Sequence, residues 1–146
     1  MAVARPDGAP ADVRVIAIAV RSEADRVLAV HRARQLALSV TCDERDRRAF
    51  ETIVLELSQN LLDHARGGQI RLRVSEEAAL EVVAFDRGPG IARLEAALRG
   101  GVTPRAGLGE GLAAVRRLSH ELRVTTLRGR GSVVLARRWP RALSAR

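Results

Sequence analysis

Lysine is absent from this sequence of 146 residues, and all 25 of its Lys/Arg positions are arginine. The absence excludes mechanisms that need an ammonium group, such as a P-loop, a Schiff base or the strand lysine of the protein-kinase fold. With 17 acidic residues the net charge is +8. Such an excess of positive charge first suggests a nucleic-acid ligand.

Aromatic residues are also scarce, at 2% of the chain. They are Phe50, Phe85 and Trp139. The arginines are spread along the chain and do not alternate with aromatic side chains, so no platform for stacking bases is visible. We therefore expect no nucleic-acid partner, and interpret the replacement of lysine by arginine as a compositional habit of the source genome.

Cysteine occurs once, at Cys42, which excludes a disulfide framework and a cysteine-based zinc site. We interpret Cys42 as a small, partly buried side chain. The three histidines, His31, His64 and His120, are too scattered to indicate a metal site. No apolar run approaches the roughly 20 residues that a membrane-spanning helix needs.

The domain organisation is predicted to be simple, because a chain of this length suits one core. Residues 1–12 lack the apolar core of a signal peptide and are expected to form a flexible lead. One domain is expected over residues 13–139, with a short tail over 140–146. We expect a cytoplasmic protein without a membrane anchor.

Hydrophobic periodicity and turn residues predict alternating groups of strands and helices. Ser22 is a candidate helix cap. The predicted strands cover 13–20, 69–74, 80–85, 122–127 and 132–138, and the predicted helices 22–39, 43–65, 94–98 and 109–121. This order is not a repeated βαβ unit. It predicts an α+β two-layer sandwich, with a mixed or antiparallel sheet and the helices on one face.

Glu56 and Asn60 lie four residues apart on the predicted 43–65 helix, so their side chains project from the same face. They flank the apolar stripe of that helix. At the margin of a core, the amide oxygen could hold Mg²⁺ and the carboxylate could accept a proton or orient a nucleophile. A solvated polar pair is the alternative interpretation.

Asp86 follows the predicted strand 80–85 and precedes Gly88, Pro89 and Gly90. This arrangement places a carboxylate beside backbone that a flat ligand can approach closely. A carboxylate accepts hydrogen bonds only, so it could select an exocyclic amine such as adenine N6. A tight turn at the end of a strand is the alternative.

Gly107, Gly109 and Gly111 lead into the predicted 109–121 helix. Glycine-rich backbone at a helix N-terminus offers unpaired N–H groups and the positive end of the helix dipole, which suit a phosphate. The pattern is not a dinucleotide fingerprint, because no βαβ unit surrounds it. A flexible loop joined to a helix that starts with glycine is the alternative.

Taken in order, ELSQN on a helix, DRGPGI after a strand and GLGEGL at a helix start resemble the N, G1 and G2 boxes of the GHKL ATP-binding fold. That family includes gyrase, Hsp90-type ATPases, histidine kinases and bacterial anti-sigma kinases, and the resemblance covers residues 13–139. Gyrase- and Hsp90-like members use a lysine from a further domain, and a histidine kinase needs a helical pair with a phospho-acceptor histidine. We therefore expect a stand-alone serine/threonine kinase.

Within that group the sequence is most similar to the RsbT type. The similarity rests on ELSQNLLDHARGGQIRLRV, on GLAAVRRLSHEL and on the ending RGRGSVVLARRW. An anti-sigma factor of the RsbW or SpoIIAB type is the nearest rival.

The resemblance implies a role for each motif. Asn60 would hold Mg²⁺ that bridges the phosphates, Glu56 would be the catalytic base or orienting group for a serine or threonine hydroxyl, and Asp86 would read the adenine amino group. The implied ATP-binding positions are Asn60, Asp86, Gly88, Gly90, Ile91, Arg105, Gly107, Leu108, Gly109, Gly111 and Leu112.

Cationic help for the phosphates would come from Mg²⁺, backbone N–H groups and arginine, because lysine is absent. Arg105, just before the glycine motif, is the candidate, with a solvated loop arginine as the alternative. Glu110 departs from the RsbT pattern, which tends to be apolar there. We expect it to point outward, because a triphosphate would repel it, and its presence argues against very tight nucleotide binding.

The resemblance implies an ATP- and Mg²⁺-dependent serine/threonine protein kinase that phosphorylates STAS-domain regulators (RsbS- or RsbR-like). Once released, it would activate a PP2C-type phosphatase in a stressosome-like partner switch. One alternative is an anti-sigma factor that binds a sigma factor and phosphorylates its STAS antagonist. The other is a nucleotide-sensing switch without catalysis, against which Glu56 and Asn60 argue. The positive net charge would favour capture of ATP and docking onto an acidic protein surface.

Overall fold

The structure is a computed structural model that describes residues 14–41, 43–100 and 111–141. Its strands are β1 (Ile16–Val20), β2 (Gly68–Val74), β3 (Leu80–Asp86), β4 (Glu121–Leu127) and β5 (Gly131–Arg138). All neighbouring strands pair antiparallel, in the order β1-β2-β3-β5-β4. β2 and β3 form an antiparallel hairpin, and both of its strands are interior to the sheet.

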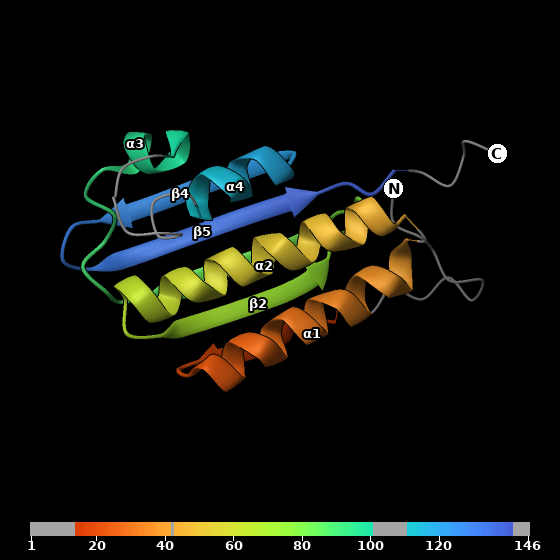
Figure 1. Cartoon of the computed structure of the whole chain (residues 1–146), viewed down its shortest axis with the longest axis horizontal. Coiled ribbons are helices and arrows are strands. Elements are labelled where there is room, and N and C mark those ends of the chain that lie inside the picture. Colours follow the sequence, from red (N-terminus) through yellow and green to blue (C-terminus); the bar gives the residue numbers. More distant parts are fainter. Residues whose placement is uncertain (1–13, 42, 101–110, 142–146) are drawn as a thin grey trace.

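The helices are α1 (Glu23–Val40), α2 (Glu44–His64), α3 (Leu94–Arg99) and α4 (Gly111–Leu118). Figure 1 shows the two long helices and α4 in front of the sheet, and α1, α2 and α4 all contact strands. The predicted α+β two-layer sandwich is therefore confirmed, and its sheet is antiparallel. None of the helices in the described ranges is both long enough and apolar enough to cross a membrane.

Side-chain caps explain where the two long helices begin. Ser22 precedes α1 and its side chain accepts a hydrogen bond from the backbone N–H of Asp25 at 3.3 Å. Asp43 precedes α2 and accepts from the N–H groups of Arg45 and Asp46. Each cap satisfies backbone donors that have no partner inside the helix. Both starts agree with the starts predicted from sequence.

The core lies between the long helices and the sheet. The predicted apolar stripe of α2 is buried, and its members are Phe50, Ile53, Val54, Leu57 and Leu61. Helix α1 contacts α2 and buries a stripe of small residues, Ala29, Ala33 and Ala37. Helix α2 in turn contacts β1, β2, β3 and β5, so it lies over the middle of the sheet.

Strand register decides which side chains face the helices. Ile18, Ile70, Ala84 and Val134 lie in one row across four strands and are all buried. Glu81 lies on the opposite face, where it accepts hydrogen bonds from Arg73 and Arg137, each at 2.6 Å. Burial alone would raise the pKa of Glu81, but the two arginines outweigh it and hold that pKa below its usual value.

The last predicted helix is shorter than expected from the sequence. Within the described residues α4 covers Gly111–Leu118, whereas the pattern predicted 109–121. The backbone N–H of His120 donates to the carbonyl of Arg137 at 2.9 Å, and Glu121 pairs with Arg137 in the sheet. Sheet pairing therefore takes the residues that helical periodicity assigned to the end of the helix.

Candidate functional site

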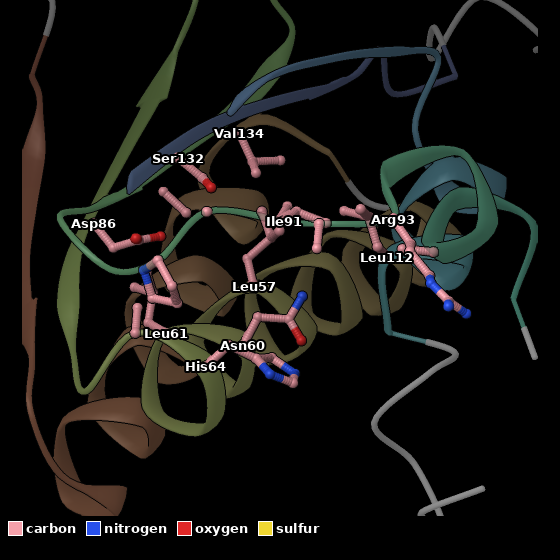
Figure 2. A pocket seen from close by; sticks show the side chains of 16 residues that line it. Leu57, Asn60, Leu61, His64, Asp86, Ile91, Arg93, Leu112, Ser132 and Val134 are labelled. Carbon is pink, nitrogen blue, oxygen red and sulfur yellow. The ribbon is translucent and has the colours of Figure 1, made fainter. Parts of the chain in front are cut away.

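A cavity of about 400 Å³ lies between the second half of α2, the loop after β3, the start of α4 and strand β5. Its volume is within the range of pockets that hold small molecules. Figure 2 shows the side chains that line it. Its apolar residues include Leu57, Leu61, Ile91, Leu112 and Val134, and its polar residues include Asn60, His64, Asp86, Arg93 and Ser132.

Asn60 lines the cavity from α2, and Glu56 lies one turn earlier on the same helix. Both meet Gly111, the first residue of α4. A Cβ atom added to Gly111 would lie 2.8 Å from Oε2 of Glu56 and 3.3 Å from Oδ1 of Asn60. The absence of a side chain therefore lets the N-terminus of α4 approach the two α2 side chains, which brings the first and third motifs together.

Glu56 is half-buried where it meets α4. Burial raises the pKa of its carboxyl above the usual value, because desolvation disfavours the charged form. A carboxylate with a raised pKa is a stronger proton acceptor. The residue is not among those that line the cavity, and it lies beside Asn60 at the cavity's α4 side.

Asp86 ends β3 and lines the cavity, with Oδ1 accepting a hydrogen bond from the backbone N–H of Gly88 at 2.8 Å. The described residues supply no hydrogen-bond donor to its other oxygen, Oδ2. Strand pairing places Ser132 of β5 directly opposite Asp86. The carboxylate of Asp86 and the hydroxyl of Ser132 therefore line the same side of the cavity.

The loop after Asp86 is held against β4. Gly90 adopts φ +84°, which L side chains rarely adopt, and a Cβ there would lie 2.9 Å from both the Leu127 carbonyl and the Thr126 hydroxyl. The backbone N–H of Ile91 donates to Thr126 Oγ1 at 2.7 Å. This contact positions Ile91 in the cavity wall.

The structure brings most of the described motif residues together. Asn60, Asp86, Gly90, Ile91 and Leu112 line one cavity. Three others lie close by: Gly88 packs against Ala65 at the end of α2, while Glu56 and Gly111 meet beside Asn60. The remaining predicted positions, Arg105, Gly107, Leu108 and Gly109, as well as Glu110, lie outside the described residues.

Several cavity residues were not predicted from sequence. His64 is one turn beyond Asn60 on the same helix, so the helical spacing that selected Glu56 could have found it. Ser132 reaches the cavity through its pairing with Asp86, which no local pattern signals. Arg93 lies between two motifs in a stretch without a sequence signature.

The arrangement suits a ligand with a flat apolar part and a charged part. Figure 2 shows Asp86 on one side of the cavity, Arg93 and Leu112 on the other, and Asn60 between them. A base could lie among the apolar side chains with an amine on Asp86, and phosphates near Asn60 would face the N-terminus of α4.

A divalent cation would be bound here by the protein together with the phosphates of the ligand, and not by protein side chains alone. No group of three or more His, Cys, Asp or Glu side chains in the described part of the chain could hold a metal ion. Mg²⁺ is usually bound through few protein oxygens together with substrate phosphates. The amide oxygen of Asn60 is suited to this arrangement. The fold and cavity together are therefore those of an ATP-binding domain.

Comparison with known proteins agrees with this class. Residues 45–142 match the histidine kinase-, DNA gyrase B- and HSP90-like ATPase family. The chain is 30% identical over 127 residues to serine/threonine-protein kinase RsbT of Bacillus subtilis (strain 168), which covers 85% of this chain and 96% of RsbT. The chain therefore belongs to this ATPase family and, within it, to the RsbT-like group. The resemblance identified from the motifs is confirmed.

Solved structures share the fold at low sequence identity. A chain of the SiaB–SiaC complex from Pseudomonas aeruginosa has a TM-score of 0.63 and 13% identity, over 84% of this chain and 88% of that one. The structure of the RsbU and RsbW domains of Rv1364c from Mycobacterium tuberculosis has a TM-score of 0.61 and 14% identity, over 90% of this chain and 33% of that one.

Proposed function

We propose that this protein is an ATP-dependent serine/threonine protein kinase of a partner-switching pathway. The observation that carries the proposal is the contact of Gly111 with Glu56 and Asn60, beside a cavity that ends at Asp86. The similarity to RsbT along nearly the whole of that protein supports it. In this proposal ATP occupies the cavity, with the adenine amino group on Asp86 and the phosphates near Asn60.

Glu56 would act as the base in phosphoryl transfer. Its carboxylate would accept the proton of a serine or threonine hydroxyl while that oxygen bonds to the γ-phosphorus and the bond to the ADP oxygen breaks. The raised pKa of Glu56 supports this role. Asn60 would hold Mg²⁺, which when bound neutralises charge on the phosphates. Because phosphoryl transfer depends mainly on positioning and charge neutralisation, the close packing of α2 on α4 is the main contribution of the fold.

The proposed protein substrates are STAS-domain regulators, and the proposed second partner is a PP2C-type phosphatase that the released kinase activates. Support for both comes from the membership in the RsbT-like group. A pull-down from the source cells tests them. Recovery of STAS proteins or a phosphatase is expected, whereas recovery of a sigma factor would favour the anti-sigma alternative.

The activity is tested by transfer of labelled γ-phosphate from ATP to a STAS protein encoded beside the gene, in the presence of Mg²⁺. The wild-type protein is expected to label the STAS protein, and Glu56→Ala is expected to lose labelling while it still binds ATP. Glu77→Ala is the matched control, because Glu77 is an exposed turn residue far from α2 in sequence. Labelling by Glu56→Ala at the wild-type rate would show that Glu56 is not the base.

A further inference from the structure

Arg93 lines the cavity directly before α3, in a position that no motif predicts. Figure 2 shows its side chain on the side of the cavity where Leu112, the second residue of α4, lies, across from Asp86. Among the described residues that line the cavity, Arg93 is the one arginine.

Arg93 is exposed to solvent, and no contact within its own segment requires an arginine there. Arg93 is the N-cap residue of α3, and its side chain makes no capping hydrogen bond. N-cap positions favour Ser, Thr, Asp or Asn, and the positive end of a helix dipole disfavours a cation. Within the described ranges Arg93 also forms no ion pair with an acidic side chain. Residues that break local preferences without a local gain are expected at functional sites.

The cavity needs a cation near Asn60 if it holds a polyphosphate. The acid that lines the cavity, Asp86, lies across it from Arg93, and Asn60, between the two, is neutral. In a sequence without lysine, arginine is the side chain that always carries a positive charge, and a metal ion or backbone N–H groups can add to it. The guanidinium group is planar and matches two phosphate oxygens at once, so arginine is well suited to this contact.

We propose that Arg93 binds the phosphate chain of the nucleotide and makes the cavity selective for ATP over the uncharged nucleoside. The guanidinium donates hydrogen bonds to phosphate oxygens from the α3 side, while Asn60 and the first N–H groups of α4 face the same phosphates. This inference rests on the proposed function, because it takes ATP as the ligand.

The test is a calorimetric titration of the full chain with ATP plus Mg²⁺, and separately with adenosine. Arg93→Ala is expected to bind ATP about 10- to 100-fold more weakly than the wild-type protein, since it loses hydrogen bonds to a charged group. Its affinity for adenosine is expected to stay unchanged. Arg93→Lys should retain part of the ATP affinity, as a point charge without the planar fork. Arg99→Ala removes an exposed arginine from the other end of α3 and is the matched control, expected to bind ATP as the wild type does.

A second measurement excludes a merely structural role. The ATP affinity of Arg93→Ala should depend less steeply on NaCl concentration than that of the wild-type protein, because one screened charge contact is gone. Equal ATP affinity in Arg93→Ala and wild type would overturn this inference and leave the proposed function standing. Equal loss of ATP and adenosine affinity, with an unchanged salt dependence, would also overturn it. Failure of the wild-type protein to bind ATP would instead overturn the proposed function.

Discussion

The contact at the start of α4 makes a sharp prediction for Gly111→Ala. The new Cβ would lie 2.8 Å from Oε2 of Glu56, closer than unbonded atoms pack, and 3.3 Å from Oδ1 of Asn60. The nearest atom is the far end of a flexible side chain, so the Glu56 carboxylate can move away at little cost. The substitution also improves helix propensity by up to about 1 kcal/mol. We therefore expect the free energy of unfolding to change by less than about 1 kcal/mol.

Gly111→Ala should lower the rate of phosphotransfer far more than it lowers the free energy of unfolding. Displacing the carboxylate by about 1 Å can reduce a rate on the order of 10²-fold, since the proton acceptor no longer meets the reacting hydroxyl. We expect Gly111→Ala to lower the rate of phosphotransfer to the STAS protein about 100-fold at saturating ATP. The rate is measured with labelled ATP, and stability is measured by urea unfolding of the same preparations.

A double-mutant cycle separates this explanation from a general disturbance of the site. In a Glu56→Ala background the added methyl group has no carboxylate to displace, so any loss in the free energy of unfolding that Gly111→Ala causes in the wild-type protein should disappear. Phosphotransfer by Gly111→Ala at the wild-type rate would refute the reasoning. A loss of several kcal/mol of stability would refute it as well, because it would mean that α4 cannot accommodate the methyl group by moving Glu56.

Three further predictions concern other parts of the molecule. Asp46 is buried, and its Oδ1 lies 2.9 Å from Nε of Arg138. Asp46→Ala leaves the charge of Arg138 largely buried and unpaired, so it should lower the free energy of unfolding, measured in urea, by about 3–5 kcal/mol. In Glu81→Gln the free energy of unfolding should fall less on acidification than it does in the wild-type protein. The folded-state pKa of Glu81 is lowered, so its stabilisation is complete above about pH 4.5 and is lost as the pH falls below that value. Asp86→Asn should weaken ATP binding about 10- to 100-fold by calorimetry, because the amine loses a charged acceptor.

Glu44→Ala removes an exposed acid from the same turn as Asp46, and a similar cost for both would contradict the buried-pair argument. An unchanged acid-unfolding profile in Glu81→Gln would mean that its arginine partners do not stabilise its charged form. If Asp86→Asn bound ATP with wild-type affinity, Asp86 would not be the acceptor of the adenine amino group.

Features of this protein that depend on near neighbours in the chain follow from its sequence. The start of α1 at Ser22 follows from a side chain that caps its own helix, and the burial of the α2 stripe follows from helical spacing. The pairing of Glu56 with Asn60 on one face is equally local. Interactions between residues three or four apart are encoded wherever a helix forms, so periodicity is sufficient to predict them. The order of the motifs then indicated the family.

The way in which distant segments meet is a property of the folded chain. The placement of β5 between β3 and β4 brings Ser132 opposite Asp86, and no local pattern specifies that pairing because strand partners are far apart along the chain. Sheet pairing also ended α4 at Leu118, earlier than its periodicity indicated. The contact of Gly111 with Glu56 and the presence of Arg93 in the cavity depend on helix packing. The family was thus predictable from the sequence motifs, while the convergence of the described motif residues on one cavity was a result of long-range packing.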